Sequence, residues 1–541
     1  MERGAGTGSY PQSHPALTVN ALDYSLVAAY FLAMIWFGLR FRKSREGTEY
    51  FLGGKEFGAF SLCMSTMATQ LSAISFVSAP AFVGLRTGGG MHWLMFEFGV
   101  PLAMIAIMVV IGPMLYRSGV LSVYSFLEKR FGQTSRLLLA SLFVLMRTFG
   151  AGIAISMVCL VLASITGLAF WKMMCLLGII TVIYSLEGGM KAIVYSEVAQ
   201  MIIKFLGILV IVAAGFYYIG GWEAFLQHVD RGRLQVIEFS NTGFDGREFG
   251  FWPMLIGGFF LYVSYYGTDQ TQAQRILSAK NEATVRRLLY FNGLFRFPVT
   301  LCYCIGGLVL GSFALANTEF AAQLHSDKPD LMIPVFVANY LPHGVIGVIV
   351  VSLIAAGMSS YSSTINSVSA VVMEDFVARF HRVPKEKYVT WSKCVALIWG
   401  LLTMALGFIA DRIAPTAIEA INKIGSLVYG PIVGIFLLAA LGPWVRSSAA
   451  NLGVLAGLLV NLWLWLACKQ VFWLWWNAIG AVTTVLLGIL LSVLMRKPND
   501  PAPSSAGFIQ VRPGREGIVL LLYFGAIFVF CLMLPHLIGN S

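Results

Sequence analysis

The sequence predicts an all-α polytopic membrane protein with about 14 transmembrane helices. Of its 541 residues, 58% are hydrophobic and only 12% are charged, whereas about 25% of residues are charged in a soluble protein. The hydrophobic residues gather in runs of about 20, long enough to cross the roughly 30 Å hydrocarbon core as helices. The net charge of +11 needs no nucleic-acid partner, because Lys and Arg gather in the cytoplasmic loops of membrane proteins.

Fourteen apolar segments follow one another along the chain. In chain order they are 22–41, 57–82, 92–117, 135–165, 169–187, 192–220, 250–277, 286–316, 335–370, 388–411, 416–441, 448–468, 472–495 and 516–538. Only Glu187 to Lys191 separates the fifth from the sixth, so the number of spans depends on this short loop. Residues 1–21 are a polar tail without a cleavable signal, since the first apolar segment can itself span the bilayer.

The orientation follows from the basic loops. The loop after the first segment contains Arg40, Arg42, Lys43, Arg45 and Lys55, and alternate loops beyond it are also basic. The positive-inside rule makes these loops cytoplasmic. Both termini are then outside, which agrees with an even number of spans. The expected location is a plasma membrane, with the bacterial inner membrane as the specific expectation.

Two hydroxyl-rich clusters lie inside apolar segments, where polar groups are costly and by default mark ion or substrate paths. The first is STMATQLSAISFVSAPAFVG, from Ser65 to Gly84. Its proline and hydroxyls predict a broken helix whose free carbonyls would face a cation or a substrate. The second is SSYSSTINS, from Ser359 to Ser367.

Helix packing in lipid explains one or two serines, and five serines in nine positions favour an ion site. Neutral hydroxyl and carbonyl oxygens suit a hard monovalent cation such as Na⁺. With one carboxylate in range, Ca²⁺ and Mg²⁺ are disfavoured.

A third cluster, YVSYYGTDQTQAQR, runs from Tyr262 to Arg275 near the expected cytoplasmic end of the seventh segment. Its tyrosines would line a substrate cavity, and we interpret its Asp269 and Arg275 end as a cytoplasmic charge network. Lys204 and Arg296 lie far along the chain from these clusters. We therefore interpret both as helix-pairing or interface residues.

The three clusters together, in this order and on these segments, resemble the sodium:solute symporter family, which includes glucose, proline, sialic acid, multivitamin and iodide transporters. The matching stretches are ATQLSAISF, YGTDQTQAQR and SSYSSTINS. The resemblance implies a LeuT-type inverted repeat of five plus five helices. Residues 1–21 would be an extracellular tail, 22–41 a leading helix, 57–441 the ten-helix core and 442–541 three trailing helices. The broken first core helix would pack against the eighth, which brings the first two clusters together.

The resemblance also implies two cation sites. The main Na⁺ site would be formed by the carbonyls of Ala68, Leu71 and Ala356 and the hydroxyls of Ser359 and Ser360. A possible second cation site would use Glu197, Ser362 and Ser363. Members that have this second site use an aspartate where this chain has Glu197, so a second Na⁺ and proton participation both stay open.

Substrate residues follow from the same resemblance. The cavity would be lined by Gln70, Ser72, Ser75, Tyr262, Tyr265 and Tyr266. Asn422 matches a substrate-contacting amide, and Arg147 and Lys423 would either pair with a carboxylate or point elsewhere. Ile74 and Ser75 stand where galactose-type members have a Glu–Gln pair, which argues against a sugar bound in that way.

The expected function is Na⁺-coupled import of a small organic solute by alternating access, with a carboxylate-bearing or amino-acid-like substrate. The alternatives are a sugar or polyol symporter, and a proton-coupled variant that uses Glu197. No enzymatic activity is expected, because the seven histidines fall in loops or at segment ends. A fused sensor kinase is not expected either, since the chain ends just after a segment, and the occluded ion site disfavours a channel. The expected partners are the solute, Na⁺ and the bilayer, without nucleic acid or an obligate protein partner.

Overall fold

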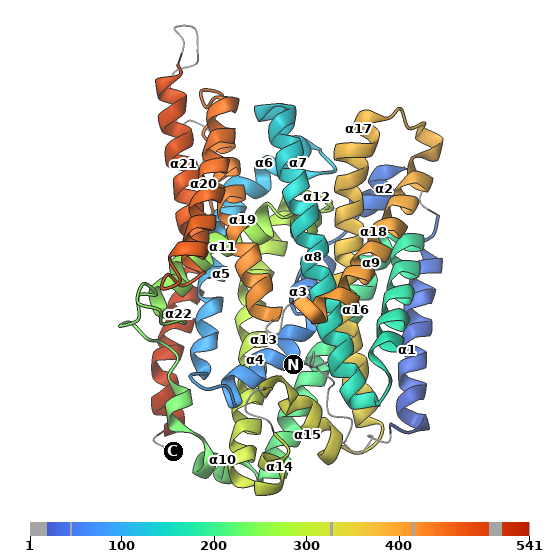
Figure 1. Ribbon diagram of the computed structural model, residues 1–541, viewed down its shortest axis with the longest axis vertical. Helices are drawn as coiled ribbons and strands as arrows, with labels where there is room; N and C mark the ends of the chain where they lie inside the picture. Colours follow the sequence, from blue (N-terminus) through green and yellow to red (C-terminus); the bar gives the residue numbers. More distant parts are fainter. Residues whose placement is uncertain (1–18, 44–45, 325–327, 414–416, 497–510, 540–541) are drawn as a thin grey trace, which may run out of the picture.

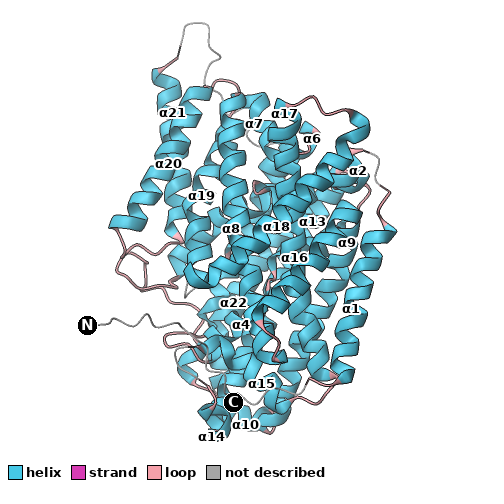
Figure 2. Ribbon diagram, turned by 45° about the vertical axis from the view of Figure 1, so that its right-hand side comes forward, coloured by secondary structure: helices cyan, strands magenta, loops and turns pink. Residues whose placement is uncertain are grey.

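The computed structural model is a bundle of long helices (Figure 1), and the residues it describes include no β-strand (Figure 2). It describes residues 19–43, 46–324, 328–413, 417–496 and 511–539. Within these ranges, the side chains of residues 73–74, 410–413 and 417–422 lie outside the description. The all-helical fold class is confirmed for the part of the chain that is described.

The helices fall into a leading helix, two halves of a core and a trailing group. The leading helix is α1, Ala21–Arg40. The first half contains α2 (Gly47–Leu52), α3 (Ala59–Gln70), α4 (Ala73–Gly84), α5 (Gly99–Ala106), α6 (Gly112–Ser118), α7 (Val123–Phe131), α8 (Gln133–Thr166) and α9 (Phe170–Ile219). The second half contains α10 (Trp222–His228), α11 (Gly258–Gly267), α12 (Gln270–Leu277), α13 (Glu282–Ala316), α14 (Thr318–Ala322), α15 (Met332–Tyr340), α16 (Val345–Val371), α17 (Ala378–Phe380), α18 (Tyr388–Ile413) and α19 (Ala417–Ala440). The trailing group is α20 (Ser447–Ala467), α21 (Trp475–Leu494) and α22 (Gly514–Gly539).

The predicted count of 14 spans is not confirmed. Among the described helices, 11 are long and apolar enough to cross a membrane, or 12 if α3 and α4 form one bent span. Two expected segments are merged in α9, whose 50 residues reach about 75 Å at the helical rise. Its backbone leaves the helical region at Gly189, where φ is +53°, so the expected loop between the fifth and sixth segments is a kink. The expected segment 250–277 is also divided, at Thr268.

Helix α16 lies in the interior, and its position decides where the site forms. It packs against α8 and α9 and also contacts α3, α4 and α12. Nearly all of its residues are buried, from Ile346 to Val371. In contrast α1 stands at one edge of the bundle, and α20 and α21 at the opposite edge (Figure 1). A hydroxyl on α16 therefore faces protein on every side.

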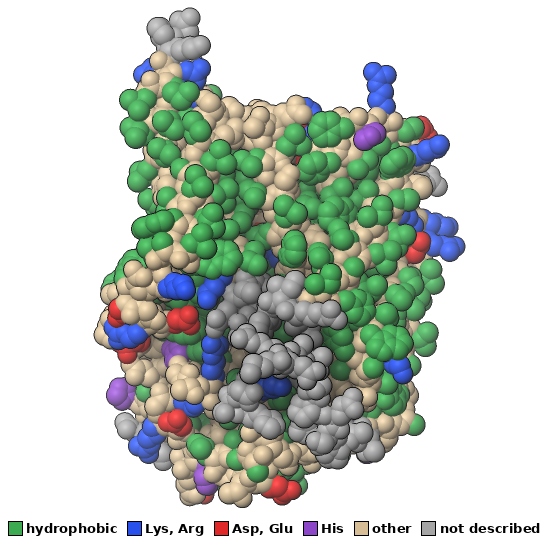
Figure 3. Space-filling view, viewed as in Figure 1, with side chains coloured by type: hydrophobic (Ala, Val, Ile, Leu, Met, Phe, Trp, Pro, Cys, Tyr) green, Lys and Arg blue, Asp and Glu red, His purple; other side chains and the backbone are tan. Residues whose placement is uncertain are grey.

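The outer surface is apolar over a broad area. Hydrophobic side chains cover much of the upper part of the face in Figure 3. On α1, Leu32 and Trp36 are exposed, as are Trp463 and Leu466 on α20. Large exposed apolar surfaces of this kind suit contact with lipid rather than water, which agrees with a multi-pass membrane protein.

Candidate functional site

The chain breaks between α3 and α4, in the first predicted cluster. Leu71 has φ −77° and ψ 78°, outside the helical region, and Ser72 is extended. The amide of Ser72 donates to the carbonyl of Gln70 at 2.9 Å rather than to that of Ala68. The two helices diverge by 59° across this break. The predicted break is present, and it leaves the Ala68 carbonyl free to accept other donors.

Serines of α16 lie against this break, as the family resemblance predicts. The hydroxyl of Ser359 donates to the carbonyl of Ala68 at 2.9 Å, and that of Ser360 donates to the carbonyl of Thr69 at 2.9 Å. Both hydroxyls also approach the carbonyl of Ala356, at 3.2 and 3.5 Å respectively. The structure therefore brings the two predicted clusters together, although about 290 residues separate them along the chain.

A lysine ammonium lies among these oxygens. Lys204 is fully buried on α9, and its Nζ donates to the carbonyl of Ala68 at 2.5 Å, to the carbonyl of Leu71 at 3.0 Å and to the hydroxyl of Ser359 at 3.1 Å. These are three of the five residues predicted to bind Na⁺. The interpretation of Lys204 as a helix-pairing residue remote from the clusters is therefore wrong. Helix packing places its long side chain at the break, whatever its distance along the sequence.

A second buried cation lies with Glu197, on the same helix. The guanidinium Nη2 of Arg275 is 2.8 Å from Glu197 Oε2 and 2.8 Å from the hydroxyl of Thr69. Its Nε donates to the hydroxyl of Ser65 at 3.1 Å, and Ser363 contacts both charged groups. Arg275 and Glu197 are both buried. The expectation that Arg275 belongs to a cytoplasmic charge network is wrong, because α12 turns inward after Thr268 and carries this side chain into the core.

Only part of the predicted second cation site comes together. Glu197 and Ser363 are in contact, but the hydroxyl of Ser362 donates to the carbonyl of Ser359 at 3.2 Å. That hydrogen bond lies within α16 itself. Glu197 accepts hydrogen bonds from Ser65, Thr69 and Ser363 in addition to its ion pair.

A cavity of about 280 Å³ adjoins the break between α3 and α4. Its walls include six of the predicted substrate residues, namely Gln70, Ser72, Ser75, Arg147, Tyr262 and Tyr265. Tyr266 lies behind this wall, and its hydroxyl donates to the side chain of Gln70. The described lining does not include Lys423, although its neighbours Ile424 and Gly425 line the cavity. The side chain of Asn422 lies outside the described part of the structure.

Two ion pairs flank the cavity. Arg147 Nη2 is 2.7 Å from Asp269 Oδ2, and the guanidinium lies over the ring of Tyr265 at 5.1 Å. Arg296 Nη2 is 3.0 Å from Glu97 Oε1. Arg296 is 7% exposed, and its Nε and Nη1 have no hydrogen-bond partner among the described residues. Unpaired buried donors are costly unless a ligand or water accepts from them.

Sequence reasoning missed Arg296 and Glu97 as cavity residues and misplaced Lys204. One signal could have indicated Lys204. It lies seven residues, about two helical turns, after Glu197 and so on the same helix face. An ionisable residue at that depth in an apolar run is a functional candidate in its own right.

Comparisons with known proteins agree with this site. The model of the Sodium:solute symporter family matches residues 50–460. Sodium-coupled monocarboxylate transporter 2 of Bos taurus is 27% identical over 449 residues, covering 82% of this chain and 72% of that protein. The Sodium/iodide cotransporter of Homo sapiens is 27% identical over 458 residues, covering 82% and 70%.

Among solved structures, a substrate-bound, outward-open Na⁺-coupled sialic acid symporter superposes with a TM-score of 0.81 at 21% identity, covering 90% of this chain and 99% of that one. A closed form of the nucleobase-cation-symport-1 transporter MHP1 gives a TM-score of 0.52 at 14% identity, covering 86% and 99%. These likenesses show the shared fold. Because the family model covers most of the chain, and because the broken α3–α4 segment faces the serines of α16, the protein belongs to the sodium:solute symporter family of multi-pass membrane transporters.

Proposed function

We propose that the protein carries a small carboxylate-bearing solute across the membrane by alternating access through the central cavity. The observation that carries this proposal is Arg296. Its guanidinium lines the cavity, is almost fully buried and has two nitrogens without a partner among the described residues. A planar guanidinium with two free N–H groups matches the two oxygens of a carboxylate.

The size and lining of the cavity favour a small solute. Its volume of about 280 Å³ lies at the lower end of ligand sites in proteins. Tyr262, Tyr265 and Tyr429 give an amphipathic wall that would hold the apolar part of a short organic acid. The relatives named as monocarboxylate transporters have a cargo of the same chemical class, which supports the proposal.

The cation that drives import is a separate matter, because the family is sodium-coupled while this chain has Lys204 at the expected main Na⁺ position. Import of the solute and use of Na⁺ must therefore be measured independently. The proposal here concerns the solute and the route. It holds for any coupling cation.

Uptake of labelled pyruvate, proline, sialic acid, pantothenate, glucose and inositol into proteoliposomes tests the proposal. We expect one or more of the carboxylate-bearing solutes to accumulate and to compete with one another. Arg296→Lys, which keeps the charge beside Glu97 but loses the fork, would lower the apparent affinity about tenfold or more. Arg287→Gln, an exposed arginine on the same helix, is the matched control. Uptake of glucose or inositol alone, or full activity of Arg296→Lys, would contradict the proposal.

A further inference from the structure

We propose that the ammonium of Lys204 takes the place of Na⁺ at the main cation site, so that transport does not draw on a Na⁺ gradient through this site. The inference rests on the proposed transport function, and it concerns the coupling cation rather than the solute. It follows from the position of one side chain relative to the oxygens that were predicted to bind Na⁺.

The ammonium makes the contacts that a bound cation would make. A lysine has three N–H donors and no acceptor, and Lys204 uses all three on Ala68, Leu71 and Ser359. Two of these acceptors are carbonyls of the broken segment, and the third is on α16. The group therefore joins the two elements that a Na⁺ ion would join.

The same oxygens cannot serve a second cation. The Ala68 carbonyl accepts from both Lys204 and Ser359, and the Ser359 hydroxyl, which donates to that carbonyl, accepts from Lys204. A Na⁺ ion placed among them would stand within a few ångströms of the ammonium, where like charges in a buried setting repel strongly. The donor set present therefore does not fit Na⁺ while the ammonium remains.

Close packing holds α9 and α16 at this point. Gly207 lies one turn beyond Lys204, and a Cβ built there would stand 2.4 Å from the hydroxyl of Ser352 on α16. That hydroxyl donates to the carbonyl of Ile203, next to Lys204, at 3.1 Å. The backbone of α9 is therefore fixed against α16 on both sides of the lysine, and the aliphatic stem of Lys204 has little room to swing away.

A tethered cation changes what the site does. In a sodium-driven carrier, the bridge between the broken helix and the eighth core helix forms when Na⁺ arrives and is lost when it leaves, so solute affinity depends on Na⁺. Here the bridge belongs to the protein itself. Solute binding then does not wait for a Na⁺ ion, and uptake proceeds equally in Na⁺ and in an inert organic cation.

Two measurements test this on the full-length protein. The first is binding of radioactive Na⁺ to purified protein, with choline as the competing salt. The second is uptake of pyruvate, or of whichever panel solute accumulates, with and without a Na⁺ gradient. For the native protein we expect no Na⁺ binding that Ser359→Ala removes, and uptake equal within about twofold in the two salts.

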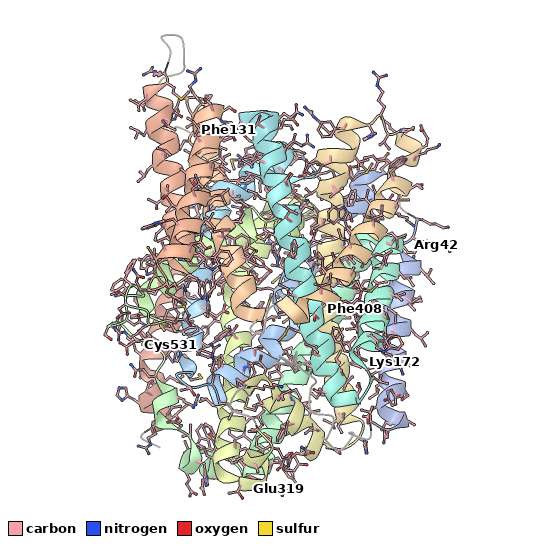
Figure 4. The ribbon with its side chains drawn as sticks, viewed as in Figure 1. Arg42, Phe131, Lys172, Glu319, Phe408 and Cys531 are labelled. Atoms are coloured by element: carbon pink, nitrogen blue, oxygen red, sulfur yellow. The ribbon has the colours of Figure 1, made fainter. Side chains whose placement is uncertain are left out.

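Lys204→Ala should reverse this behaviour, because it opens the site while leaving its oxygens in place. We expect saturable Na⁺ binding to appear, and uptake without Na⁺ to fall about tenfold and to recover when Na⁺ is added. Lys204→Met, which fills the space without charge, should lose uptake in both salts. Lys172→Ala, an exposed lysine on the same helix at the edge of the molecule (Figure 4), should behave as the native protein.

The native protein decides the matter even if the variants fail to fold. Na⁺ binding or Na⁺-dependent uptake in the native protein that Ser359→Ala abolishes would overturn the inference. If no solute accumulates in any salt, the proposed function fails, while the Na⁺-binding measurement still decides the role of Lys204. The two failures are therefore distinguishable.

Discussion

The guanidinium of Arg275 lies 2.8 Å from the carboxylate of Glu197, and both groups are buried in the core of the bundle. The two residues come from α12 and α9, which are 78 positions apart at this contact. Ser65, Thr69 and Ser363 supply further hydrogen bonds. The place expected for a second cation thus contains a cation belonging to the chain, and four predictions follow from this and from the neighbouring contacts.

Glu197→Gln should destabilise the protein by about 3–5 kcal/mol, because it leaves the charge of Arg275 buried and unpaired. The thermal unfolding midpoint of detergent-purified protein measures this. Glu319→Gln, an exposed carboxylate at the lower end of the bundle in Figure 4, should leave the midpoint unchanged. Adding Arg275→Gln to Glu197→Gln should cost less than the sum of the two single changes. An unchanged midpoint for Glu197→Gln would refute the structural role of this pair.

Ser363→Ala should cost about 1–2 kcal/mol of unfolding free energy, since its hydroxyl is bonded to the charged groups of Glu197 and Arg275. Ser369→Ala is the matched control. It is buried on the same helix, and its hydroxyl donates only to the carbonyl of Ile365 one turn earlier. Unfolding of the two variants under the same conditions should rank Ser363→Ala as the less stable. The reverse order would contradict the cluster.

Gly150→Leu should weaken solute uptake while the fold is retained. Gly150 lines the cavity, and a Cβ built there meets nothing within 4 Å, so the larger side chain would occupy the space of the solute. We expect the KM for the accumulated solute to rise about tenfold or more. Gly150→Ala should change it little, and the unfolding midpoint should be the same for both. Equal KM values for Gly150→Leu and the native protein would place the solute elsewhere.

Gly307→Ala should destabilise the bundle by about 1–3 kcal/mol through overpacking. A Cβ at Gly307 would stand 2.5 Å from the carbonyl oxygen of Pro80, so α13 and α4 meet there backbone to backbone. Gly306→Ala offers the control one position away, because its Cβ would find only flexible side-chain atoms at 3.4 Å. Circular dichroism during heating should separate the two. Similar midpoints would show that α4 can move aside without cost.

Much of the fold class and part of the site could be predicted from residue types and spacing. Runs of apolar residues long enough to span, together with basic loops, indicate a multi-pass bundle. The hydroxyls at Ser359 and Ser360 and the break near Leu71 were predicted, and the structure brings them together. Span number was less predictable, because a kink at Gly189 merges two segments and Thr268 divides another.

The sequence by itself determined which oxygens surround the expected cation site, since a break in α3–α4 and a cluster of serines are local properties of the chain. Only the tertiary structure decided what those oxygens bind. Lys204 and Arg275 lie 133 and 206 positions from Leu71 and Thr69, their respective partners, and no spacing rule reaches that far. The packing of α9 against α16 and the inward turn of α12 bring the two cations to the oxygens. A buried charge acquires its role from the neighbours it meets after packing, and those neighbours are chosen by the arrangement of the helices.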